Sequence, residues 1–334
     1  MKLRWLLPSI VSAVLISEPA RADQPYQFAH QPTVPTAIAQ ASTPLTAPSA
    51  TPDLGVLPLG QPLTWLQQRL ATYRTRYPAF RTGMFFLDMD NGNYADLNGT
   101  QVFPAASIIK LPILVAFFQA VDAGKVRLDE TLTMRPEMIA SGSGEMQFLR
   151  PWSKFSALHT VTQMSVISDN TATNMILRRL GGATVVNQRF RSWGLQQTTI
   201  RNWLPDLRGT NTTTPKELVY LLLQLEQGKL LSPQTQQQAF GILTRTKNRK
   251  LLAAGVGPGA VIAHKTGDIG FMLGDAGLVR MPSGKRYMAA VIAKTPYDDP
   301  KGWDFMRDVS RIVYTYLSQP APAALEEPRD SNGF

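Results

Sequence analysis

The chain has 334 residues, of which 44% are hydrophobic, so it is long enough to bury one large core or two ordinary ones. It contains no cysteine, which excludes disulfides, thiolate nucleophiles and thiolate metal sites. The net charge of +10 suits an anionic partner, but the basic residues are spread along the chain, so we expect most of this charge to serve solubility.

The first 22 residues read as a secretory signal peptide. Lys2 and Arg4 precede an apolar run over residues 5–16, and Ala20-Arg21-Ala22 is a small-x-small cleavage site. An uncleaved membrane anchor is the alternative, but the run is shorter than the roughly 20 apolar residues that a spanning helix needs. We therefore expect an exported, periplasmic protein that is not inserted in the membrane after signal removal and binds no nucleic acid.

Two segments have compositions that cannot bury a core. Residues 23–61 are dominated by Pro, Thr, Ala, Ser and Gln, and are expected to form a disordered tether. The Pro-rich and charged residues 319–334 are expected to form a disordered tail. The folded unit is then predicted to span residues 62–318, without internal repeats.

The folded unit is expected to open with a helix and a hairpin. Apolar spacing predicts an amphipathic helix over residues 63–77. Residues 81–98 alternate like strands around Asn91-Gly92, a strong hairpin-turn signal. Further helices are predicted at 107–123, 161–180, 184–193, 215–227 and 233–243.

The chain returns to strands near its end. Strands are predicted at residues 261–265, 274–281 and 286–293, followed by a helix over 302–317. Strands at both ends with helices between them predict an α/β (α+β) fold. It consists of one antiparallel sheet built from both chain ends and flanked by helices, with an all-α region beside it.

Ser107 and Lys110 lie three residues apart at the start of an apolar helix, so their side chains share one helical face. A neutral lysine in this place can take the serine proton, and burial favours the neutral form by desolvation. The helix N-terminus would help to hold an oxyanion near the Ser107 amide. Because Ser-x-x-Lys occurs by chance in many chains, this pair alone is weak evidence for a nucleophile and its base.

Ser168-Asp169-Asn170 places a hydroxyl and an amide side by side. The serine can relay a proton to a leaving nitrogen, and the asparagine can hold a substrate amide. The alternative is ordinary helix capping by Ser168 or Asp169, which these residue types do routinely.

Lys265-Thr266-Gly267 follows at the end of the predicted strand 261–265 and offers a cation, a hydroxyl and a glycine that lets substrate approach the backbone. A carboxylate is the natural ligand, whereas the alternative is a strand-end lysine and an ordinary turn glycine. His264 is expected to point to the opposite face of the strand, as a packed or capping residue rather than a base. The three histidines include no pair at metal-ligand spacing, so no metal or other cofactor is expected.

These three motifs, in this order and in these structural settings, resemble the penicillin-interacting serine enzymes. The segments 141–147, 168–174 and 212–215 are similar to the class A β-lactamase branch. The resemblance implies a β-lactamase/DD-peptidase-like fold, with the active site in the cleft between an α/β and an all-α domain. It also implies the roles of the site residues: Ser107 as nucleophile, Lys110 and Ser168 in proton transfer, Asn170, Lys265, Thr266 and Gly267 in substrate binding, and the amides of Ser107 and Asp268 as the oxyanion hole.

One departure from the class A pattern bears on function. That family carries a glutamate that activates the deacylating water, and this chain has Leu204 at that place and Arg208 where the family has a water-holding asparagine. A leucine can neither accept a proton nor order a water, so efficient penicillin hydrolysis is not expected. The sequence is instead similar to the cyanobacterial penicillin-binding protein A group. Asp206 is a less favoured candidate for a displaced base.

The resemblance therefore implies a serine D-Ala-D-Ala peptidase that acts on peptidoglycan stem peptides and is acylated by β-lactams with slow deacylation. A weak class A β-lactamase is one alternative. A non-catalytic wall-binding or β-lactam-sensing protein is another, although all three motifs are retained. The natural peptide and the oligomeric state stay open.

Overall fold

The computed structural model describes residues 59–319. The expected signal peptide, nearly all of the expected tether and the tail beyond residue 319 lie outside the described residues. The amide of Gly60 already donates to the Gly92 carbonyl at 2.9 Å, so the chain is fixed to the first hairpin slightly before residue 62. No helix in the described part is long and apolar enough to cross a membrane.

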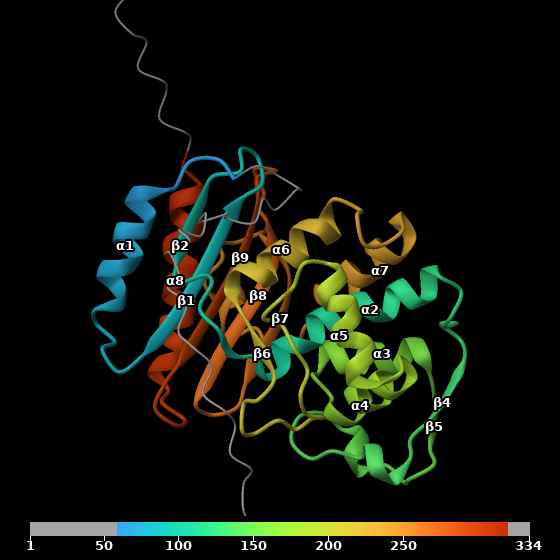
Figure 1. Ribbon diagram of the computed structural model, residues 1–334. Helices are drawn as coiled ribbons and strands as arrows, with labels where there is room; N and C mark the ends of the chain where they lie inside the picture. Colours follow the sequence, from blue (N-terminus) through green and yellow to red (C-terminus); the bar gives the residue numbers. More distant parts are fainter. Residues whose placement is uncertain (1–58, 320–334) are drawn as a thin grey trace, which may run out of the picture. The chain divides into compact units, whose positions relative to one another are not determined.

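Within residues 59–319, a five-stranded antiparallel sheet has the order β2-β1-β9-β8-β7 (Figure 1). Residue Met84 of β1 lies opposite Val291 of β9, so the N-terminal hairpin is joined directly to the C-terminal strands. This confirms the predicted sheet from both chain ends. Its strands are β1 (Arg81–Asp88), β2 (Tyr94–Leu97), β7 (Val261–Asp268), β8 (Met272–Arg280) and β9 (Arg286–Lys294).

Helices cover both faces of this sheet, which explains why β1, β8 and β9 are buried along nearly their whole length rather than at alternate residues. The rear face packs against α1 (Thr64–Arg74) and α8 (Lys301–Leu317), around a core that includes Leu66 and Phe305 (Figure 1). The front face packs against α6 (Pro215–Glu226) and the 3-10 helix η1 (Ala106–Ile109), which leads into α2 (Lys110–Asp122).

The remaining helices form the predicted all-α region around α2, whose side chains are nearly all buried. Two short ribbons tie the loops together: β3 (Phe103–Pro104) with β6 (Thr212–Thr213), and β4 (Thr131–Thr133) with β5 (Lys154–Ser156). The helices are α3 (Ala157–Val166), α4 (Asn170–Arg179), α5 (Gly182–Ser192) and α7 (Pro233–Leu243).

Three predictions of element boundaries need correction. The single helix predicted over 161–180 is wrong: α3 and α4 are separate, and Ser168 between them adopts a left-handed φ of 60°. The strand predicted to end at Lys265 continues to Asp268, because it pairs with β8 over its whole length. The helix predicted from Ser107 begins as the 3-10 helix η1 (Ala106–Ile109) and continues as α2.

Candidate active site

Three segments that are far apart in the sequence meet at the front edge of the sheet. Ser107 on η1, Ser168 in the α3–α4 break and Lys265 on β7 line one cavity of about 240 Å³. A second cavity of about 100 Å³ adjoins Ser107 and is also lined by Asn170 and Leu204. The structure therefore brings together every site residue that the sequence singled out: Lys110 through its bonds to Ser168, and Thr266, Gly267 and Asp268 as lining residues.

Gly267 allows β7 to lie directly against the start of η1. A Cβ at this position would lie 3.0 Å from the Ser107 amide nitrogen and 2.9 Å from the Ile108 nitrogen. Both contacts are tighter than ordinary packing, so a side chain here would push the strand away from the serine. The glycine expected to admit substrate thus also sets the distance between Ser107 and the Lys-Thr-Gly strand.

Lys110 is completely buried, yet its ammonium has three acceptors. It donates to the Ser168 carbonyl, to Ser168 Oγ at 3.1 Å and to Asn170 Oδ1 at 2.9 Å, whereas Ser107 is not among its partners. Burial, reinforced by the nearby positive charge of Lys265, holds the pKa of Lys110 well below its ordinary value. A lysine so placed loses its proton more readily than an exposed lysine, and in the neutral form it can accept one.

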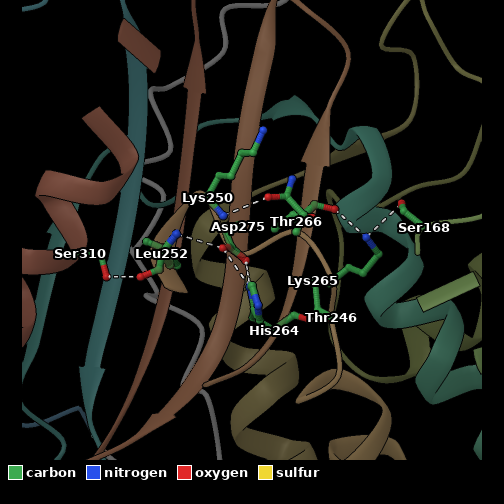
Figure 2. A network of polar contacts seen from close by, with 10 residues as sticks. Ser168, Thr246, Lys250, Leu252, His264, Lys265, Thr266, Asp275 and Ser310 are labelled. Atoms are coloured by element: carbon green, nitrogen blue, oxygen red, sulfur yellow. Dashed lines mark hydrogen bonds and ion pairs between the residues drawn. The ribbon is translucent and has the colours of Figure 1, made fainter. Parts of the chain in front are cut away.

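Lys265 reaches the same serine from the opposite side of the cavity. Its Nζ donates to Ser168 Oγ at 3.1 Å and to the Thr266 carbonyl at 2.7 Å, and Figure 2 shows the side chain extended toward Ser168. Burial lowers the pKa of Lys265 to about 7, and the Asp275 carboxylate opposes that shift. Ser168 Oγ is therefore placed between two buried lysines, where it can pass a proton.

The strained Ser168 is held in place by its neighbours. Asp169 is the N-cap of α4: its carboxylate accepts from the Ala172 amide at 2.8 Å and from the Met146 amide at 2.9 Å. Asn170 donates to the Ser141 carbonyl at 2.8 Å. Capping thus explains Asp169 but not Ser168, whose hydroxyl faces the two lysines.

Leu204 is clamped so that its side chain lines the smaller cavity. Its amide donates to Asn174 Oδ1 at 3.0 Å, and Asn174 Nδ2 donates back to its carbonyl at 2.8 Å. Asp206, the candidate for a displaced base, uses both carboxylate oxygens within its own loop, accepting from Thr210 Oγ1 at 2.8 Å and from the Asn211 amide at 2.6 Å. Arg208 is exposed and lies outside the residues that line this cavity.

Some residues of the site were not found by sequence reasoning. Thr246, Lys247 and Asn248 form a wall of the larger cavity, but no local pattern distinguishes them from a surface turn. Asn174 had a usable signal, since it lies four residues after Asn170 and hence on the same face of α4. In residues 59–319, no group of three His, Asp or Glu side chains is arranged to hold a metal ion.

The model of the "Beta-lactamase enzyme family" matches residues 65–317, which is most of the chain. The chain belongs to this family. It is 25% identical to a β-lactamase of Streptomyces albus G over 262 residues, covering 74% of this chain and 83% of that protein. It is 29% identical to a β-lactamase of Kitasatospora aureofaciens over 251 residues, covering 70% of this chain and 78% of that protein.

Among solved structures, PBP-A is 52% identical with a TM-score of 0.77, over 78% of this chain and 98% of the other. A leucine-to-glutamate mutant of PBP-A, solved as an acyl-enzyme complex with penicillin G, matches with the same identity and TM-score over 78% of this chain and 99% of the other. The chain is therefore a PBP-A-like serine enzyme of the class A β-lactamase type that interacts with β-lactams.

Proposed function

We propose that this enzyme is a periplasmic serine D-Ala-D-Ala peptidase that acts on peptidoglycan peptides through an acyl-enzyme at Ser107. β-Lactams acylate the same serine, and the resulting adduct is hydrolysed slowly. The observation that carries this proposal is the apolar side chain of Leu204 in the cavity beside Ser107 and Asn170. The penicillin G acyl-enzyme of a PBP-A mutant supports the covalent step.

The proposed acylation uses the two lysines in different protonation states. Neutral Lys110 takes the Ser107 proton as Oγ attacks the carbonyl carbon, and the carbonyl oxygen gains the negative charge beside the amides of Ser107 and Asp268. When the C–N bond breaks, the proton returns through Ser168 to the leaving nitrogen, leaving the acyl group esterified to Ser107. Protonated Lys265, with Thr266, binds the carboxylate of the substrate.

Deacylation needs a water that is both oriented and deprotonated. Leu204 can neither orient a water nor accept its proton. The Asp206 carboxylate borders the cavity but accepts two hydrogen bonds from its own loop. Asp268 also borders the cavity, is exposed, and accepts from the Gly270 amide at 2.8 Å. A general base contributes roughly 10²–10⁴-fold, so without one the penicilloyl ester should persist.

The first prediction is that penicillin G adds one covalent equivalent to the enzyme, and that Ser107→Ala abolishes the adduct. Intact-mass spectrometry over time gives both the stoichiometry and the lifetime, and release of D-alanine from a D-Ala-D-Ala peptide gives the peptidase rate. An adduct on Ser107→Ala would contradict the nucleophile assignment. Rapid loss of the wild-type adduct would favour a β-lactamase, and a stable adduct without peptide turnover would favour a β-lactam-sensing protein.

A further inference from the structure

A buried histidine–carboxylate pair lies directly behind the Lys-Thr-Gly strand. His264 of β7 and Asp275 of β8 both have completely buried side chains. His264 Nδ1 lies 2.9 Å from one carboxylate oxygen of Asp275 and 3.0 Å from the other. A carboxylate only accepts, so Nδ1 carries the hydrogen. The contacts confirm that His264 is a packed residue.

The pair and Lys265 occupy opposite faces of the same two strands. Successive side chains of a strand alternate, so His264 points to the rear core and Lys265 to the cleft. In the β7–β8 register Thr266 lies opposite Asp275 and Lys265 opposite Ala276, which places the carboxylate diagonally behind the lysine. Figure 2 shows the two side chains leaving the strand in different directions.

The pair is also tied to the wall of the cleft. Asp275 Oδ2 accepts from the Leu252 amide at 3.1 Å, and the Leu252 carbonyl accepts from Ser310 Oγ of α8 at 2.8 Å. Thr246 Oγ1 donates to the His264 carbonyl at 2.7 Å. These bonds hold both ends of the segment 246–252, whose first residues line the cavity with Lys265 (Figure 2).

The immediate surroundings of Lys265 give its charge little compensation. Its two hydrogen-bond acceptors, Ser168 Oγ and the Thr266 carbonyl, are neutral. Lys110, which lies nearby on α2, brings no negative charge, and Lys247 lines the same cavity from the 246–252 segment. Asp268 borders the cavity from the end of β7, but it is exposed, so water screens its charge.

The charged side chains of α8, on the rear side, pair mainly with one another. Arg307 contacts Asp304 at 2.7 Å and Asp308 at 3.7 Å, and Arg311 contacts Asp308 at 3.3 Å. Each of these groups is partly or largely exposed to water. Asp169 is a second buried carboxylate, but its charge acts on Lys110 and its oxygens accept from the Ala172 and Met146 amides. Asp275 is therefore the buried anion that acts on Lys265, and low-dielectric surroundings make its field effective across the strand.

We propose that Asp275, held by His264 and the Leu252 amide, is a positioning residue that keeps the buried Lys265 protonated for recognition of the substrate carboxylate. It touches no substrate and acts through the charge of Lys265. The inference rests on the proposed carboxylate-binding role of Lys265 but not on the peptidase activity, because β-lactam acylation reports on it directly.

The test compares the pH dependence of the second-order rate constant for acylation by penicillin G in the full-length wild type and Asp275→Asn. Asparagine keeps the shape and an acceptor for the Leu252 amide but removes the charge. The high-pH fall in acylation, where Lys265 loses its proton, should move to lower pH by roughly one unit. Ser310→Ala removes a neutral hydrogen bond from the same network and should leave that midpoint in place.

An unchanged midpoint in folded Asp275→Asn, or an equal fall in rate at every pH, would overturn the proposal in favour of a purely structural role. Lys265→Arg tests it from the other partner, whether or not Asp275→Asn folds. A guanidinium stays protonated without a counter-charge, so the high-pH fall should disappear below about pH 10. If the high-pH fall in acylation by Lys265→Arg stayed at the wild-type pH, a group other than Lys265 would be responsible for that fall. If Ser107 is not acylated at all, the proposed function fails before this question arises.

Discussion

Lys110 and Lys265 show how one cleft assigns different tasks to two residues of the same type. Both are completely buried, so desolvation lowers the pKa of each. Lys110 also faces the positive charge of Lys265, which favours its neutral form, whereas Asp275 favours the charged form of Lys265. The environments therefore suit Lys110 to accept a proton and Lys265 to bind an anion. The residue type is lysine in both cases, so the sequence alone does not distinguish these roles.

In the proposed function, Leu204 is the residue that distinguishes slow deacylation from hydrolysis of penicillin. Its backbone is fixed by Asn174 and its side chain lines the cavity beside Ser107, so a longer carboxylate at this position would extend toward the ester. We expect Leu204→Glu to speed decay of the penicilloyl adduct by about 10–100-fold, short of the full effect of a general base because the water is not otherwise oriented. Intact-mass spectrometry after removal of excess penicillin measures this decay.

The matched control for this change is Leu204→Gln, which has the same length but cannot accept a proton from water at neutral pH. The penicilloyl adduct of Leu204→Gln should decay at the wild-type rate. Arg208→Asn should add little to Leu204→Glu, because Arg208 is exposed and does not line the cavity. Equal decay in the Glu and Gln variants would show that the gain comes from space for water rather than from a base.

At the scale of elements, the break between α3 and α4 is what delivers Ser168 to the lysines. The start of α4 is held by the loop of residues 139–145, whose Ser143 carbonyl accepts from the Asn170 amide at 2.9 Å and whose Gly144 has a φ of 99°. A Cβ on Gly144 would overlap both the Cα and the carboxylate of Asp169. The loop can therefore approach the start of α4 only because this residue is glycine.

Gly144→Ala should consequently lower both stability and activity. Positive-φ strain and the clash with the Asp169 backbone together should lower the free energy of unfolding by about 2–5 kcal/mol. Because Ser168 is the neighbour of Asp169, acylation by penicillin G should fall more than 10-fold. Denaturant unfolding and intact-mass kinetics measure the two effects.

Gly124→Ala is the matched control, since Gly124 also has a positive φ of 65° but has no atom within 4 Å of the position that a Cβ would take. It should cost roughly 1–2 kcal/mol of stability and leave acylation unchanged. If Gly144→Ala reduced stability no more than Gly124→Ala and left acylation intact, the loop would not position Ser168.

The helix break also marks where sequence reasoning stops. Residues 161–180 have continuous helical spacing, and local signals do not reveal that Ser168 takes a left-handed conformation, since its partners come from residues 110 and 265. By contrast, α7 begins where the sequence predicted, because Ser232 caps it and Pro233 starts it, and it also ends at the predicted Leu243. The three motifs could be predicted as one site through the family resemblance, whereas the wall at Thr246 and the anion at Asp275 depend on long-range packing.

On the scale of the whole folded unit, the sheet separates two hydrophobic cores. The front core surrounds α2 and the active-site residues, and the rear core lies under α1 and α8. The strands separate the neutral side chains of the rear core from the cleft, so these side chains do not contact the active-site residues. A charge on the rear face, such as that of Asp275, can still act across the strands, because electrostatic effects extend beyond contact. Stability and activity should thus respond separately to apolar changes behind the sheet.

Phe305→Ala tests this separation. Phe305 is completely buried on α8 and packs edge-on against Tyr77 and Phe80, with ring centroids 5.2 and 5.8 Å away. Truncating it should cost about 3–5 kcal/mol and lower Tm by roughly 10 °C. Acylation by penicillin G at 25 °C should stay within about twofold of the wild type, because Phe305 belongs to the rear core and lines neither of the two active-site cavities.

Trp303→Ala on the same helix supplies the control, because this side chain is 42% exposed and lies outside the rear core; the Nζ of Lys250 is 4.8 Å from its ring centroid. Loss of that cation–π contact should cost only about 0.5–1 kcal/mol. Thermal unfolding and acylation kinetics on the three proteins decide the question. Parallel losses of Tm and acylation rate in Phe305→Ala would mean that the rear core shapes the cleft through packing, and the two layers would then have to be treated as one.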